Sequence, residues 1–150
     1  MLQIPQNRAI LAVDPGRITG YVLVGGGGVI LEQDERYADD FLAWAESVFT
    51  MPAEKLTVVC EDFQVTQRTL KLARDSRWWS LEQIGVLRWW SHRLGCRFIL
   101  QSPASALKLV TDARLEPFGL NKRGGKGHYR DASRHLVYHL VREYGAELAV

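Results

Sequence analysis

The sequence predicts an α/β fold, in which five short strands form a sheet and helices pack against it. Two observations support this prediction. Five apolar runs are too short for buried helices and are rich in residues that favour strands. Between and after them, other segments repeat their apolar residues at the 3.6-residue spacing of a helix. A chain of 150 residues with 47% hydrophobic content fits a single domain, residues 1–150, with a substantial core.

The first strand is predicted over residues 9–13, and Asp14-Pro15-Gly16 follows it. Proline fixes φ and glycine tolerates positive φ, so the chain turns sharply here. Strands over 21–24 and 29–32 complete an antiparallel meander. The glycines at 25–28 do not form a nucleotide-binding loop, because no helix beginning with Lys-Ser/Thr follows them. Taken alone, the aspartate is better explained as a turn residue than as a ligand.

A second carboxylate follows a later strand in the same way. Residues 38–49 have the apolar spacing of a helix that covers the sheet, and 56–60 forms the next strand, directly before Glu61. If this strand is the parallel neighbour of the first, Asp14 and Glu61 meet at one edge of the sheet. Carboxylates so placed can share two divalent cations about 3.5 to 4 Å apart. Asp62 points to the opposite face of an extended chain, so we leave it out of this set.

Basic side chains recur at intervals of three through residues 63–77: Arg68, Lys71, Arg74 and Arg77. If this segment is helical, they form a ridge suited to phosphates, and a merely solvated face explains them equally well. A helix over 80–94 follows, with Ser80 and Gln83 in a capping-box pattern. A fifth strand is predicted over 96–100.

The last third of the chain combines a basic loop with a histidine–aspartate pair. A short helix over 103–110 carries Lys108, and residues 121–127 are rich in glycine, lysine and arginine, which suits a phosphate backbone. In the final helix, 128–144, His128 and Asp131 lie at i and i+3, with His135 another turn along. All three flank the apolar stripe and therefore face the edge of the sheet. A lone histidine there is usually structural, but this pair is a better candidate for metal binding.

The net charge of +2 hides an asymmetry. Residues 1–62 carry 4 basic and 10 acidic side chains, whereas residues 63–150 carry 15 and 7. This suits acidic groups around a cation together with a basic surface for a polyanion. Only two cysteines occur, both within apolar runs, so we expect buried reduced thiols. Without a signal-peptide pattern over 1–7 or a membrane-length apolar run, we expect a cytoplasmic protein with no membrane partner.

Three motifs, in this order, resemble the RuvC family of Holliday-junction resolvases within the ribonuclease H-like superfamily, especially its short bacteriophage-type members. They are Asp14-Pro15-Gly16 with Thr19-Gly20, Glu61 at the end of a strand, and His128-x-x-Asp131-Ala132. Each motif is weak alone, and the ordered set, which spans nearly the whole chain, is fairly specific. The resemblance implies a ribonuclease H-like five-stranded mixed sheet flanked by helices, in bacterial or bacteriophage-infected cytoplasm.

The resemblance also implies roles for single residues. Asp14, Glu61 and Asp131 would be catalytic carboxylates that bind metal, and His128 would occupy a position where many bacterial members have a fourth carboxylate. Phe63 falls near the family's aromatic wedge and Lys108 near a DNA-contacting lysine. The full set predicted to contact nucleic acid is Phe63, Arg68, Lys71, Lys108, Lys122, Arg123 and Lys126. Between Lys108 and the last helix, this chain is shorter than the bacterial enzymes. The difference concerns the part of those enzymes that bears on their dimer interface and their junction-specific contacts.

The function predicted from these observations is a metal-dependent, structure-selective DNA endonuclease for recombination and repair. It would hydrolyse phosphodiesters in four-way junctions, flaps or forks with two Mg²⁺ or Mn²⁺ ions, and would act as a homodimer. Two alternatives stay open: an RNA-processing nuclease of the same fold, and a non-catalytic nucleic-acid-binding module. Sugar-kinase and actin-type ATPases need two lobes, for which 150 residues leave no room.

Overall fold

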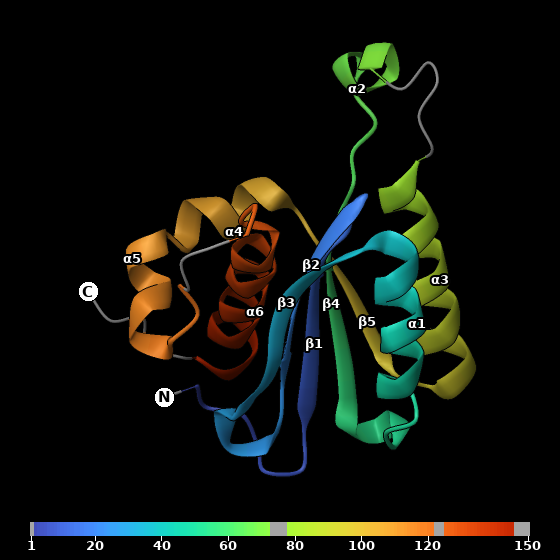
Figure 1. The fold of residues 1–150 in the computed structure, drawn as a ribbon. Helices are drawn as coiled ribbons and strands as arrows, with labels where there is room; N and C mark the ends of the chain where they lie inside the picture. The colour runs from blue at the N-terminus through green and yellow to red at the C-terminus, as the bar shows by residue number, and fades with distance from the viewer. Residues whose placement is uncertain (1, 73–77, 122–124, 146–150) are drawn as a thin grey trace.

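A five-stranded mixed sheet lies at the centre of the computed structural model, which describes residues 2–72, 78–121 and 125–145 (Figure 1). The strands are β1 (Ala9–Asp14), β2 (Ile18–Val24), β3 (Ile30–Tyr37), β4 (Leu56–Glu61) and β5 (Arg97–Gln101). Their order across the sheet is β3-β2-β1-β4-β5. The meander β1-β2-β3 is antiparallel, and β4 is parallel to both β1 and β5. The predicted mixed sheet is thus confirmed.

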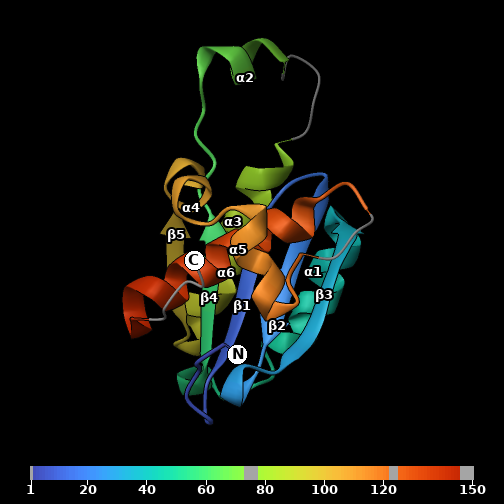
Figure 2. The same cartoon turned by 90° about the vertical axis from the view of Figure 1, so that its left-hand side faces the viewer.

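Helices cover both faces of the sheet. The α-helices are α1 (Ala38–Val48), α2 (Gln67–Leu72), α3 (Trp79–Leu94), α4 (Pro103–Leu109), α5 (Asp112–Leu115) and α6 (His128–Tyr144), and short 3-10 helices span Gly26–Gly28, Ala53–Lys55 and Glu116–Phe118. Helices α1 and α3 lie on one face, and α4, α5 and α6 lie on the other (Figures 1 and 2). Helix α2 projects away from both layers. Among the described residues, no helix is long and apolar enough to cross a membrane.

The alternation of side chains along the strands divides the core into two. In β1, Leu11 and Val13 face α1 and α3, whereas Ile10 and Ala12 belong to the cluster under α6. All four are essentially without exposure. Because successive side chains of a strand point to opposite faces, the next residue, Asp14, points to the α6 face. The strand that carries the first carboxylate therefore also aims it at the last helix.

The same alternation aims Glu61. In β4, Val58 and Cys60 lie in the core under α1 and α3, and Val59 lies in the core under α6. Glu61 therefore points to the α6 face as well. In the register, Val13 of β1 pairs with Cys60 of β4, so the two strands end side by side. The predicted meeting of the two strand-end carboxylates is confirmed at the level of the backbone.

Strand β3 differs most from the prediction. It runs over Ile30–Tyr37, whereas an end at Glu32 was predicted. The added residues are mainly charged and polar, because β3 is an edge strand and its side chains are half-buried or exposed. Glu35, near the end of β3, binds the backbone just before α6.

Candidate metal centre

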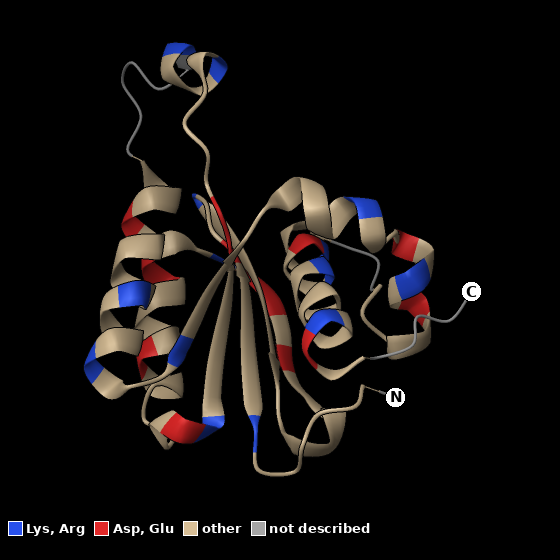
Figure 3. Cartoon of the chain, turned by 180° about the vertical axis from the view of Figure 1, so that it is seen from behind, with Lys and Arg blue, Asp and Glu red and all other residues tan. Residues whose placement is uncertain are grey.

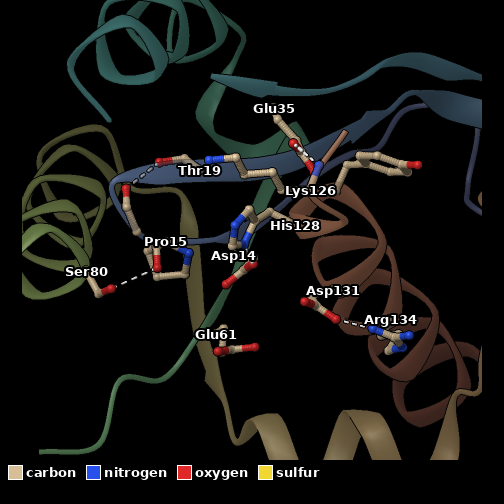
Figure 4. A network of polar contacts seen from close by, with 12 residues as sticks. Asp14, Pro15, Thr19, Glu35, Glu61, Ser80, Lys126, His128, Asp131 and Arg134 are labelled. Carbon is tan, nitrogen blue, oxygen red and sulfur yellow. Dashed lines mark hydrogen bonds and ion pairs between the residues drawn. The ribbon is translucent and has the colours of Figure 1, made fainter. Parts of the chain in front are cut away.

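Asp14, His128 and Asp131 converge between the end of β1 and the first turn of α6 (Figure 4). One possible ligand atom from each residue lies within 4.8 Å of the other two. The Nδ1 atom of His128 is 3.0 Å from Oδ2 of Asp14. Two carboxylates and an imidazole within this space form a group of potential ligands for one divalent cation.

Gly20 explains how α6 comes so close to the sheet. This residue is the register partner of Asp14 in β2, and a Cβ atom built on it would lie 2.0 Å from the backbone carbonyl carbon of His128. Any side chain at position 20 would push the first turn of α6 away from Asp14. The Thr19-Gly20 element of the sequence motif therefore has a direct physical role, since it lets the helix seat its two ligands beside the first carboxylate.

Glu35 of β3 fixes the start of α6 from across the sheet. Its Oε2 accepts a hydrogen bond from the backbone N–H of Lys126 at 2.9 Å. Burial alone would raise the pKa of Glu35. Hydrogen bonds from the backbone N–H groups of Lys126, His128 and Tyr129 have the larger combined effect and hold this pKa below its ordinary value. An ionised carboxylate at a helix N-terminus also complements the helix dipole. Glu35 thus holds the turn that carries His128.

The surroundings of Asp14 favour a cation. Asp14 is 8% exposed, and burial raises its pKa from 3.8 to about 8, with further contributions from Glu61, Asp131 and Glu35. The pKa stays this high although His128 lies within hydrogen-bonding distance. Three negative neighbours around a buried carboxyl group are unfavourable unless a positive charge joins them. This electrostatic arrangement, together with oxygen-rich ligands, fits Mg²⁺ or Mn²⁺, and the imidazole favours Mn²⁺.

Glu61 lies at the same end of the sheet but outside the three-residue cluster. His135 Nε2 is 2.8 Å from Glu61 Oε2, and His135 Nδ1 is 2.9 Å from Gln101 Oε1. Gln101 is also the register partner of Glu61 in β5. His135 is 1% exposed, so neither of its bonds is shared with bulk water. Metal-binding side chains are commonly oriented by such buried partners.

Asp131 has a basic neighbour on its other side. Arg134, one turn further along α6, donates to Asp131 through Nη1 and to Asp112 of α5 through Nη2 (Figure 4 shows the first contact). The side chain of Arg134 is 14% exposed and that of Asp131 45%. Asp131 is therefore the most accessible carboxylate of the cluster, and its orientation is fixed by a largely buried guanidinium.

The residues predicted to contact nucleic acid are spread over several elements. Phe63 is half-buried, and its ring centroid lies 6.0 Å from that of Trp78. Arg68 and Lys71 are exposed on the projecting α2, which carries blue segments in Figure 3. Lys108 on α4 is also exposed. Their contact with nucleic acid stays a prediction.

The basic loop before α6 is described only in part. Lys126 is exposed, and its backbone, as shown above, is bonded to Glu35. Lys122 and Arg123 lie outside the described residues, as do Arg74 and Arg77 of the earlier basic segment.

Several residues of the site were missed or misjudged from the sequence. Gln101 was missed, although it lies, like Asp14 and Glu61, at the end of a strand at this edge of the sheet. The capping-box prediction for Ser80 and Gln83 is wrong: the N-cap of α3 is Trp78, which makes no side-chain capping bond. Both side chains bind the turn after Asp14 instead.

No family model and no curated protein sequence matches this chain. Two solved structures are similar over nearly the whole chain. The structure of Thermus thermophilus RuvC in complex with a Holliday junction substrate is superimposed with a TM-score of 0.64 at 15% identity, covering 95% of this chain and 99% of that chain. A second T. thermophilus RuvC structure gives a TM-score of 0.58, with the same identity and coverage. This likeness confirms the predicted RuvC-like, ribonuclease H-like fold.

Proposed function

We propose that this protein is a divalent-metal-dependent endonuclease that cleaves branched DNA such as four-way junctions. The observation that carries the proposal is the convergence of Asp14, His128 and Asp131 within 4.8 Å, on a fold whose solved relative binds a Holliday junction. Glu61 ends the neighbouring strand and adds a third acidic group at this edge.

The proposed reaction is hydrolysis of a phosphodiester. When bound, the divalent ions would supply an activated water and stabilise the leaving oxygen, so the protein needs no covalent nucleophile. Asp14, His128 and Asp131 would hold one ion, and Glu61 would contribute to a second. Burial of Asp14 excludes water from one side of the site, which strengthens its attraction for a cation.

The substrate would approach the open side of the cluster. Asp131 is the most exposed ligand, and α4 with Lys108 lies on the same face of the sheet as α6 (Figure 2). The projecting α2 presents Arg68 and Lys71 beyond the end of β4. Lysine and arginine at these places would neutralise phosphates on more than one arm of a branched DNA. A homodimer, a cytoplasmic location and the bacteriophage-type assignment stay predictions of the sequence.

The test is incubation of the purified protein with end-labelled four-way junction, flap, fork, duplex and RNA–DNA hybrid, with and without Mg²⁺ or Mn²⁺. We expect metal-dependent nicks in the branched DNA and much slower cleavage of the duplex. Asp14→Asn should abolish cleavage but keep DNA binding within a few fold, and Asp40→Asn, which changes an exposed carboxylate on α1, should cleave like the wild type. Preferred cleavage of the RNA strand would instead identify an RNA-processing nuclease. Binding without any cleavage would identify a non-catalytic module.

A further inference from the structure

Two side chains of α3 bind the backbone directly after Asp14. The Ser80 hydroxyl donates to the carbonyl oxygen of Pro15 at 2.8 Å, and Nε2 of Gln83 donates to the carbonyl oxygen of Gly16 at 2.6 Å. These two carbonyls belong to the residues that follow the buried carboxylate. Their positions therefore limit the directions in which Asp14 can point.

Of the two side chains, Gln83 is buried and is itself held from a second side. Thr19 Oγ1 donates to Gln83 Oε1 at 2.8 Å, and Gln83 and Thr19 are 1% and 0% exposed. The next carbonyl of the turn, that of Arg17, accepts from the backbone N–H of Ala38 at the start of α1 at 3.0 Å. Water cannot replace buried partners at little cost, so these bonds strongly restrict the turn.

Two helix layers thus act on Asp14 from opposite faces of the sheet. Helices α1 and α3 hold the backbone that follows it, and α6 on the other face supplies His128 and Asp131 to its carboxylate. The relative position of the ligands depends on both layers. The bonds of Ser80 and Gln83 have no role in capping α3, because neither side chain makes a capping bond.

We propose that Ser80 and Gln83 are positioning residues that set the direction of Asp14 for metal binding. The inference rests on the proposed function in so far as it concerns the same metal site. Partners that orient a metal ligand typically change metal affinity by about 10 to 100-fold when removed. Gln83 makes two bonds, one buried and one half-buried, and Ser80 makes one half-buried bond, so Gln83 has the larger effect.

Helix α3 also offers a matched control. Ser91 is 1% exposed, and its hydroxyl has no hydrogen-bond partner within the described part of the chain. Ser91→Ala therefore removes a buried hydroxyl from the same helix without touching the turn after Asp14. Gln83→Met removes both amide bonds while nearly preserving side-chain volume.

The experiment is isothermal titration of each full-length variant with MnCl₂ well below its Tm, with circular dichroism as the check of folding. We expect Kd for Mn²⁺ to rise by about tenfold or more in Gln83→Met and by about threefold in Ser80→Ala, and to stay within twofold of the wild type in Ser91→Ala. A folded Gln83→Met variant with wild-type Mn²⁺ affinity overturns the inference. If this variant does not fold, Ser80→Ala decides in the same way.

Junction cleavage separates this inference from the proposed function. Weaker Mn²⁺ binding in the two variants, with no cleavage of any nucleic acid by the wild type, supports positioning and overturns the nuclease. Cleavage by the wild type, with unchanged Mn²⁺ affinity in the two variants, supports the nuclease and overturns the positioning role of Ser80 and Gln83. Where cleavage occurs, Gln83→Met should lower kcat at limiting Mn²⁺ and leave KM for the junction unchanged. A wild-type chain that binds no Mn²⁺ overturns both proposals.

Discussion

Replacing Asp14 by asparagine should stabilise the metal-free protein while removing its metal site. The folded state raises the pKa of Asp14 from 3.8 to about 8, so at pH 7 the carboxyl group must take up a proton to stay in the fold. At about 1.36 kcal/mol for each pH unit above 3.8, this costs about 4 kcal/mol at pH 7. Asparagine has no proton to lose, and its amide can keep a hydrogen bond to His128.

The sign of the pH dependence follows from a pKa that is raised in the folded state. The stability linked to Asp14 is fully present below about pH 4 and is lost as the pH rises toward about 8. The advantage of Asp14→Asn should therefore grow with pH over this range. For a domain of 150 residues, 1 kcal/mol corresponds to about 2 to 4 °C in Tm, so we expect a gain of about 10 °C at pH 7 and about 3 °C at pH 4.5.

The assay is thermal unfolding in EDTA at several pH values, followed by circular dichroism. Asp40→Asn is the control, because this exposed carboxylate in the first turn of α1 makes a small favourable contribution to the helix and its loss should not raise Tm. Adding Mn²⁺ should then raise the Tm of the wild type but not that of Asp14→Asn. A gain that is equal at both pH values, or absent at pH 7, would refute the electrostatic reasoning for this site.

Three further predictions concern the support of the site and its substrate. Gly20→Ala should prevent stable folding, because its Cβ would lie 2.0 Å from the backbone of His128, whereas Gly85→Ala, with nothing within 4 Å, should raise stability by about 0.5 to 1 kcal/mol in urea unfolding. His128→Ala should fold and need more Mn²⁺ for cleavage, and His128→Asp should shift the metal preference toward Mg²⁺. If both variants show the wild-type dependence of cleavage rate on the concentration of each cation, His128 has a purely structural role. Replacing Arg68 and Lys71 by alanine should weaken junction binding and reduce the slope of log K against log salt by about 0.9 for each phosphate that the protein no longer neutralises, and an unchanged slope would exclude α2 from the interface.

Local patterns were sufficient for most of the fold. Five apolar runs gave the five strands, and the helical spacing after residue 127 predicted α6 with its observed bounds, His128–Tyr144. They also showed that Asp14 and Glu61 follow two apolar runs in the same way, so that the two carboxylates would meet if the strands were parallel neighbours. The observed parallel pairing of β1 with β4 meets that condition. These features depend on the repeat of a strand or helix and on the burial of one of its faces. Both can be recognised from the order of apolar and polar residues within one segment.

Edge positions were harder to predict. The charged second half of β3 shows no apolar alternation, since an edge strand gains its hydrogen bonds on one side and leaves many side chains in water. Glu35 was therefore not recognised as the carboxylate that fixes the start of α6. Its sequence distance from Lys126 exceeds the reach of any capping rule, which considers only neighbours within one helical turn.

The sequence by itself determined where the strands that carry Asp14 and Glu61 end and where the last helix begins, and it thus placed Asp14, Glu61, His128 and Asp131 at one edge. Only the tertiary structure decided their partners. His135 binds Glu61 from a helix 74 positions later, and Gln83 binds the turn after Asp14 from 67 positions beyond Gly16. Such pairs depend on the order of the strands and on how closely each helix docks. Neither the strand order nor the docking distance of a helix can be read from the spacing of apolar residues. The repeats of 2 residues in a strand and 3.6 in a helix specify which side chains share a face, but not which side chains of another element they contact.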